Sequence, residues 1–394
     1  MKKFLALTLA LVMSLSLVAC GDKKTDDTKT DEPDQKTEQP AENEGAYKVA
    51  MITDYGDITD QSFNQTTYEA CKAYCSENSL DFNYFKPASD SDADRVAMIE
   101  KAIADGYNVI VMPGYAFAKA IKQTVNTYTD VKFVALDVGA GDLNTFNDDG
   151  SIKEEFKVPS NLYCAVYQEE LCGYMAGYAA VKLGYKQLGF LGGMAVPAVV
   201  RYGYGFIQGV NAAATELNIA DQVSIKYVYG NKFGPAPEIT AVMDTWYKGG
   251  TEVVFACGGG IYTSAVDAAK KVGAKVIGVD VDQAGIIDGA YGEGMTVTSA
   301  MKGLAPTVKT VLAAISADKW ADFGGKIETL GLVSETPEDN YVQLAGSTQF
   351  ADGFTQDDYK TLVASMFKGD ITVDNSTDKQ PEVSVKVETF DNIL

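Results

Sequence analysis

From Tyr47 onward, short apolar runs alternate with longer stretches in which apolar residues recur at helical spacing. Strands that alternate with helices in this way are typical of parallel sheets flanked by helices. Two of the runs, 109–113 and 253–256, are apolar at successive positions, as strands buried on both faces should be. The pattern therefore predicts an α/β fold with mostly parallel sheets.

The alternation falls into two successive blocks, one ending near residue 160 and the other near residue 300. We expect two lobes, each built on a doubly wound, mostly parallel sheet. The first lobe is expected to comprise 47–165 plus about 300–325, and the second 166–299 plus about 326–394. The predicted strands are 48–53, 82–85, 109–113, 133–137, 163–167, 188–192, 224–228, 253–256, 276–280 and 295–298. The predicted helices are 62–78, 93–105, 116–128, 169–183, 199–217, 237–248, 262–272 and 305–318.

The start of the chain has the pattern of a secretory signal. Lys2 and Lys3 precede an apolar run over 4–18, and the small residues of Leu-Val-Ala come directly before Cys20. We expect a signal peptide at 1–19. The cysteine after it resembles the lipobox of bacterial lipoproteins, which implies a lipid on Cys20; the alternative is an ordinary signal peptide that ends near a cysteine. Residues 20–46 are nearly all polar and predict a lipid-anchored, disordered acidic linker.

Composition excludes several functions. The net charge of −21 disfavours binding to nucleic acid. The chain has no histidine, so it lacks every Ser-His or Cys-His arrangement and the commonest transition-metal ligand. We therefore expect no enzyme, no metal site and no cofactor. Apart from Cys20, an odd number of cysteines remains, and we expect them to be buried free thiols.

Polar residues follow several predicted strands at the point where each strand ends. Because ligands of open α/β sheets lie beyond the carboxyl ends of the strands, these residues are candidates for a binding cleft. An aspartate at a strand end can instead cap the next helix, which is the main alternative for each one taken alone. The candidates are Asp54, Asp137, Asp280, the turn Gly258–Gly260, and Lys302.

Several motifs together resemble one known family. The segment ITDYGDITDQSFNQTTYEA at 52–70 is similar to the opening signature of the basic membrane protein family, and QEELCGYMAGYAA, IGVDVDQ and VTSAMK follow in the order typical of that family. The resemblance covers about residues 47–305. It implies a two-lobed periplasmic-binding-protein-like fold of type I. It also implies a lipoprotein that binds purine nucleosides between the lobes for an ABC importer.

The resemblance implies a role for each matching residue. Asp54 and Asn64 would surround the purine base, and Asp137 would bind its edge. Phe63 would stack on one face of the base and Phe233, from the other lobe, on the opposite face. An ionised aspartate only accepts hydrogen bonds, so it suits the N–H groups of a purine.

The same resemblance implies a sugar site. Asp280 would accept hydrogen bonds from the ribose hydroxyls, while Lys302 and a backbone amide near Gly259 would complete the site. We expect Lys302 to lie near Asp280 and to keep its carboxylate ionised.

Some aromatic assignments stay open. Trp246 or Tyr229 could replace Phe233, because the sequence before Phe233 departs from the usual spacing of the family. Tyr115, Phe117 and Tyr55 could be either core aromatics or additional walls of the cleft.

The expected function is that of an extracytoplasmic, lipid-anchored solute-binding protein, a monomer that delivers purine nucleosides to a membrane permease. A binder of sugars or of other small polar ligands on the same fold, or a ligand sensor, is the alternative.

Overall fold

The computed structural model describes residues 47–394, and these residues lie within one compact unit. The predicted signal peptide, the linker and Cys20 lie outside the described residues. Among the described helices, none has both the length and the apolar character needed to cross a bilayer.

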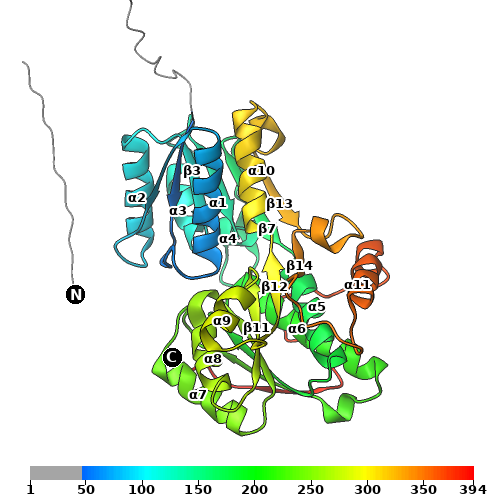
Figure 1. The fold of residues 1–394 in the computed structure, drawn as a ribbon. Helices are drawn as coiled ribbons and strands as arrows, with labels where there is room; N and C mark the ends of the chain where they lie inside the picture. Colours follow the sequence, from blue (N-terminus) through cyan, green and yellow to red (C-terminus); the bar gives the residue numbers. More distant parts are fainter. Residues whose placement is uncertain (1–46) are drawn as a thin grey trace, which may run out of the picture. The chain divides into compact units, whose positions relative to one another are not determined.

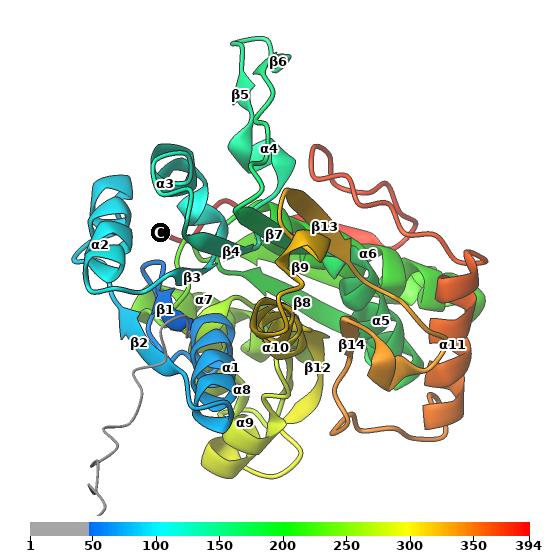
Figure 2. The ribbon, with the colours of Figure 1, turned by 90° about the horizontal axis from the view of Figure 1, so that it is seen from above.

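The first sheet contains six strands in the order β13-β7-β4-β3-β1-β2. All neighbouring strands in it run parallel. Helices α1 and α10 cover one face and α2 and α3 the other (Figure 2). The strands are β1 (Lys48–Ile52), β2 (Asp81–Phe85), β3 (Val109–Pro113), β4 (Lys132–Leu136), β7 (Leu162–Tyr167) and β13 (Lys326–Leu330). The helices are α1 (Phe63–Glu77), α2 (Asp92–Ala104), α3 (Ala118–Thr124) and α10 (Leu304–Ser316).

The second sheet contains seven strands in the order β14-β12-β11-β10-β8-β9-β15, and only β14 pairs antiparallel to its neighbour. The strands are β8 (Gln187–Gly192), β9 (Ser224–Tyr229), β10 (Val253–Cys257), β11 (Lys275–Asp280), β12 (Thr296–Lys302), β14 (Val342–Leu344) and β15 (Lys386–Thr389). The helices of this lobe are α5 (Glu169–Lys182), α6 (Pro197–Glu216), α7 (Pro237–Lys248), α8 (Tyr262–Ala269), α9 (Ala284–Tyr291) and α11 (Gln356–Lys368).

Helices α5 and α6 approach each other closely because glycines line their contact. A Cβ atom at Gly177 would lie 2.3 Å from the carbonyl oxygen of Phe206, and one at Gly205 would lie 2.1 Å from that of Glu170. A side chain at either position would push the two backbones apart. The glycines of QEELCGYMAGYAA and of α6 therefore let α5, the helix that carries Glu169 and Glu170, pack directly against α6.

The chain passes between the two lobes after β7, after β12 and after β13 (Figure 1). Helix α10 packs on the first lobe against α1, and the chain then adds β13 to the first sheet by pairing with β7. The first lobe therefore extends to Leu330. The expected boundary near residue 325 is too early, because the alternating charged sequence of β13 gives little indication of a strand.

All predicted strands and helices are present, with small differences at their ends. The largest differences are in α3, which ends at Thr124 instead of near residue 128, and in β12, which continues to Lys302 instead of ending near residue 298. The short or polar elements were not predicted, namely β5 (Thr145–Phe146), β6 (Ile152–Glu154), β13, β14, β15, α4 (Ala140–Leu143), α9 and α11.

The cysteines among the described residues are all free and buried, as expected. Burial raises the pKa of the Cys75 thiol to about 11, so it stays protonated.

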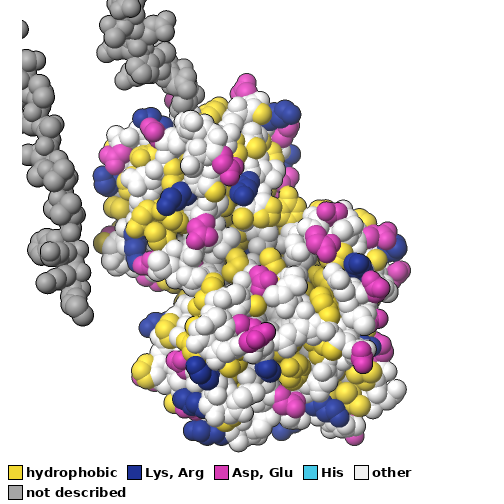
Figure 3. All heavy atoms as spheres, viewed as in Figure 1, with side chains coloured by type: hydrophobic (Ala, Val, Ile, Leu, Met, Phe, Trp, Pro, Cys, Tyr) yellow, Lys and Arg dark blue, Asp and Glu magenta, His cyan; other side chains and the backbone are white. Residues whose placement is uncertain are grey.

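On the face shown in Figure 3, Lys and Arg side chains are scattered among Asp and Glu instead of forming a basic patch.

Candidate functional site

A cavity of about 760 Å³ lies between the two lobes. Its walls come from the carboxyl ends of β1, β3 and β4 on one side and of β8, β10 and β11 on the other. Every residue that the resemblance implies for the ligand lines this cavity, namely Asp54, Phe63, Asn64, Asp137, Phe233, Gly259, Asp280 and Lys302.

The strand-end aspartates do not cap the helices that follow them. In each case a second aspartate does so. Asp60 accepts the backbone N–H groups of Ser62, Asn64 and Gln65 at the start of α1. Asp282 accepts the N–H of Ala284 at the start of α9, and Asp142, within α4, accepts the N–H of Gly139 directly before that helix. The capping alternative is therefore ruled out for Asp54, Asp137 and Asp280, whose carboxylates remain directed at the cavity.

Asp137 and Asp280 share an unusual backbone conformation. Their φ angles are 59° and 64°, in the left-handed region that most residues with a side chain avoid. Aspartate tolerates this region better than most residues, and strained backbone of this kind is concentrated at functional sites.

Lys302 is the centre of a buried ionic network. Its ammonium lies 2.7 Å from the Asp137 carboxylate and 3.0 Å from that of Glu169. Arg201 donates through Nε to the other oxygen of Glu169 at 2.6 Å. Burial alone would lower the pKa of Lys302, but the carboxylates of Asp137, Glu169 and Asp280 raise it above its ordinary value. The lysine therefore stays charged.

Lys302 lies close enough to Asp280 to lower the pKa of its carboxyl group, as expected, but Asp280 is not its direct partner. Asp280 instead accepts a hydrogen bond from the hydroxyl of Ser62 at 2.6 Å, a contact that joins the two lobes. Burial raises the pKa of Asp280, and the opposing effect of Lys302 is smaller. Although β12 pairs with β11, the ammonium of Lys302 reaches across to the carboxylate that follows β4, so its direct partner is Asp137.

Asp54 and Asn64 form a second polar group in the cavity. The Asp54 carboxylate accepts the N–H of Gly56 at 2.5 Å. Burial raises the pKa of Asp54 to about 6, against the lowering effect of the hydrogen bonds from Gly56 and Asn64. The side-chain oxygen of Asn64 is buried and has no hydrogen-bond partner among the described residues, and the same holds for one oxygen of Asp137. Both atoms are thus free to accept from a ligand.

Both expected aromatic residues, Phe63 and Phe233, line the cavity, and each ring has a further neighbour. The Phe63 ring lies with its centroid 5.1 Å from the Lys302 nitrogen. The Phe233 ring meets Tyr55 from the opposite lobe, with centroids 6.1 Å apart and an angle of 30° between the planes. Tyr55 and Tyr115 both line the cavity, so both are walls of the cleft.

The other candidate aromatic residues are Phe117, Trp246 and Tyr229, and none of them lines the cavity. Phe117 is fully buried in the core beneath α3. Trp246 and Tyr229 are absent from the cavity walls, and Phe233 is present there. Trp246 is buried in the core of the second lobe, and the Tyr229 hydroxyl pairs with that of Tyr227 at 2.8 Å.

The glycine turn Gly258–Gly260 provides the seat for Phe233. A Cβ atom at Gly258, whose φ is 144°, would lie 2.8 Å from the Phe233 ring. The N–H of Gly260 donates to the carbonyl oxygen of Phe233 at 3.0 Å. The turn therefore holds an aromatic wall in place.

Sequence reasoning missed Glu169 and Arg201 as residues of this region. Glu169 is fully buried, and Arg201 lines the cavity. The available indication was the pair of glutamates that opens α5, since glutamates at an apolar helix need partners when buried. Among residues 47–394, no group of three or more acidic, Cys or His side chains is placed to hold a metal ion.

Solved structures show the same fold. The fold is similar to an ABC transporter solute-binding protein from Aeropyrum pernix K1, with a TM-score of 0.63, 17% identity and coverage of 83% of this chain and 87% of that one. One from Conexibacter woesei DSM 14684 gives a TM-score of 0.62 at 20% identity, covering 84% of this chain and 99% of that one. The two-lobed α/β fold of solute-binding proteins is thus confirmed.

The sequence defines the family within that class. The profile of the Bmp family, described as "ABC transporter substrate-binding protein PnrA-like", matches residues 47–344. The chain therefore belongs to this family of substrate-binding proteins, and the resemblance inferred from the motifs is confirmed.

Named relatives agree with this assignment. The "ABC transporter nucleoside-binding protein BmpA" of Lactococcus lactis subsp. cremoris is 26% identical over 249 residues, which cover 60% of this chain and 64% of that protein. The chain thus spans slightly less than two thirds of that relative. "Basic membrane protein B" of Borreliella burgdorferi is 23% identical, over 77% of this chain and 82% of the relative. A "CD4+ T-cell-stimulating antigen" of Listeria innocua is 28% identical, over 72% and 74%.

Proposed function

We propose that this protein captures purine nucleosides outside the cytoplasm and delivers them to an ABC permease, while a lipid on Cys20 keeps it at the membrane. The observation that carries the proposal is the convergence of three strand-end aspartates, freed from helix capping, and Lys302 on one cavity. The family and the nucleoside-binding relative support the same ligand class.

The base would lie near Asp54, Asn64 and Asp137. The unpartnered oxygens of Asn64 and Asp137 accept hydrogen bonds, and purines carry N–H donors on their edges. Phe63 and Phe233 offer aromatic faces, and stacking of a base on such a face is worth about 1–3 kcal/mol. Phe233 already contacts Tyr55, so Tyr55 belongs to the aromatic wall at the same end of the cavity.

The sugar would lie between Asp280, Lys302 and the Gly259 turn. An ionised Asp280 suits two neighbouring hydroxyl donors, and charge-assisted bonds contribute about 1.5–3 kcal/mol each. The cavity walls carry more acidic than basic side chains, which favours a neutral ligand over a phosphorylated one.

The proposed mechanism is closure of the lobes around the ligand without covalent chemistry, by a monomer with no cofactor. A ligand-sensing role on the same fold would require the same cavity but no permease. Size-exclusion chromatography with light scattering tests whether the protein is a monomer in solution.

Mass spectrometry of the ligand released on denaturation of purified protein is the most direct test. We expect a purine nucleoside at one per chain. Calorimetric competition among adenosine, guanosine, ribose and galactose separates nucleoside binding from the sugar-binding alternative. Preferential binding of the free sugars would overturn the proposal, and release of free base from inosine would show that the protein is an enzyme.

The anchor has its own test. Cys20→Ala should release the protein from the membrane fraction and leave the affinity for the nucleoside unchanged. Membrane retention of this variant would contradict the lipid anchor.

A further inference from the structure

We propose that Tyr55 and Phe233 form a clasp between the lobes, that its opening limits the release of ligand, and that Arg95 is the positioning residue that holds Tyr55 in place. The part concerning release rests on the proposed function. The contact itself comes from the structure, because Tyr55 follows β1 of the first lobe and Phe233 follows β9 of the second.

Tyr55 touches two separate loops of the second lobe. Its ring stacks on Phe233 with a centroid distance of 6.1 Å, and its hydroxyl donates to the sulfur of Met194 at 3.5 Å. Burial, with the nearby charge of Asp54, raises the pKa of Tyr55 well above its ordinary range. The hydroxyl therefore stays protonated and remains a donor at any physiological pH.

Phe233 has a fixed seat on the second lobe. Its ring covers Gly193 and Gly258, where Cβ atoms would lie 2.4 Å and 2.8 Å from it. Its carbonyl oxygen accepts from Gly260. A ring held in this way presents a preformed surface to Tyr55, so little order is lost when the clasp closes.

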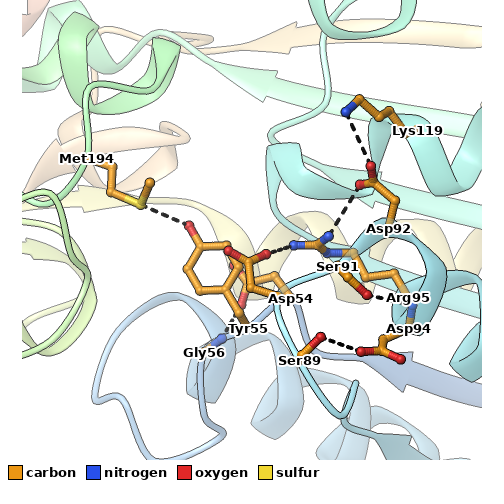
Figure 4. A network of polar contacts seen from close by, with 11 residues as sticks. Asp54, Tyr55, Gly56, Ser89, Ser91, Asp92, Asp94, Arg95, Lys119 and Met194 are labelled. Carbon is orange, nitrogen blue, oxygen red and sulfur yellow. Dashed lines mark hydrogen bonds and ion pairs between the residues drawn. The ribbon is translucent and has the colours of Figure 1, made fainter.

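Arg95 supports Tyr55 from behind. The arginine comes from α2 and is only 3% exposed, and its guanidinium carbon lies 5.9 Å from the centre of the Tyr55 ring. It forms ion pairs with Asp90 and Asp92, and Asp92 also meets Lys119. Figure 4 shows Tyr55 between Met194 on one side and this charged network on the other. A buried arginine fixed by two carboxylates is a rigid platform for a cation–π contact.

Tyr55 has no evident role in the cores. It belongs to none of the hydrophobic core clusters of residues 47–394, whereas Phe233 packs against the largest of them. Replacing Tyr55 should therefore leave the fold intact and change only the contact between the lobes.

The test compares Tyr55→Ala and Tyr55→Phe with Tyr84→Ala, a control in the exposed edge strand β2 outside the cavity. In stopped-flow experiments with guanosine, Tyr55→Ala should accelerate dissociation about 2- to 10-fold, the size expected for one aromatic pair. Tyr55→Phe should lie closer to the wild type, and Tyr84→Ala should match it. Unchanged dissociation in Tyr55→Ala would overturn the proposal.

Small-angle X-ray scattering of the protein without added ligand gives a second measurement that does not depend on nucleoside binding. Tyr55→Ala should increase the radius of gyration, since the lobes open more often, and Tyr84→Ala should not. If the wild type binds no nucleoside, the proposed function fails while scattering still decides the clasp. An unchanged radius of gyration would refute the clasp.

Arg95 is tested by a double-mutant cycle. Arg95→Met should accelerate dissociation in the presence of Tyr55 but have no further effect in the Tyr55→Ala background. Equal effects in both backgrounds would show that Arg95 acts on the fold alone, and would remove it from the clasp.

Discussion

The ammonium of Lys302 lies 2.7 Å from the carboxylate of Asp137, although Lys302 ends a strand of the second sheet and Asp137 follows a strand of the first. This ion pair crosses the lobes at the inner wall of the cavity. With Glu169 on its other side, Lys302 balances a group of buried carboxylates that would otherwise repel one another.

Removing this cation should be costly. Lys302→Met leaves Asp137 buried without its partner and leaves Glu169 with Arg201 alone. Breaking a buried pair from one side costs about 3–5 kcal/mol of unfolding free energy. Urea denaturation measures the loss, and calorimetry should find no nucleoside binding. The matched control is Lys271→Met, whose partner Asp244 lies at the surface, and it should cost at most about 1 kcal/mol. Equal losses in both variants would contradict the central role of Lys302.

Asp54 should give the wild type a distinctive dependence on pH. Its pKa is about 6 in the folded protein against 3.8 for the ordinary group, so the folded state binds the proton more tightly than the unfolded state. The contribution of Asp54 to stability is therefore favourable at low pH and is lost as the pH rises from about 4 to about 6.

The neutral variant Asp54→Asn isolates this effect. The quantity to compare is the unfolding free energy of Asp54→Asn minus that of the wild type. This difference should be larger at pH 7.5 than at pH 4.5, by an amount on the order of 2–3 kcal/mol. Denaturation at the two pH values measures the difference. A gap of the opposite sign would mean that the carboxylate is stabilised in its ionised form. Nucleoside affinity of the wild type should fall below pH 6 as Asp54 is protonated.

Asp280 should matter for binding and not for folding. Asp280→Ala removes the acceptor proposed for the ribose and leaves the Ser62 hydroxyl free to find water, so affinity should drop below detection by calorimetry. The melting temperature should change by only a few degrees, because burial already opposes the charge of this carboxylate. Affinity within twofold of the wild type would remove Asp280 from the site.

Gly258 should be intolerant of any side chain. Gly258→Ala places a Cβ atom against the Phe233 ring at a φ of 144°, so the ring must move from its seat. We expect a loss of about 1–3 kcal/mol in stability and a weaker affinity for the nucleoside. Gly285→Ala is the control, since nothing lies within 4 Å of its new Cβ atom in helix α9. It should be neutral or slightly stabilising, and a similar loss in both variants would separate Gly258 from the site.

The sequence predicted the strand-end residues well because their position depends on local order. Asp54, Asp137 and Asp280 follow apolar runs directly, and parallel strands bring such positions to one edge. The motif pattern then identified the family, which the local chemistry alone could not do.

Contacts between distant segments were not predictable in the same way. Ser62 and Asp280 are 218 residues apart, and their hydrogen bond depends on how the lobes meet. The same is true of Tyr55 with Phe233, which the pattern left as one of several aromatic possibilities. Short polar strands such as β15 lack an apolar run, so they become visible only through their pairing with β9.

The return of the chain to the first sheet has a consequence for synthesis. Strand β13 pairs with β7 only after β8 to β12 have been made, so the first sheet stays incomplete until Leu330 has left the ribosome or the export channel. Domains usually fold in order from the amino terminus as they emerge. The first sheet of this protein cannot be completed before β13 has been made. A cut anywhere between Tyr167 and Lys326 would leave β7 and β13 on different fragments, so neither fragment would contain the whole first sheet.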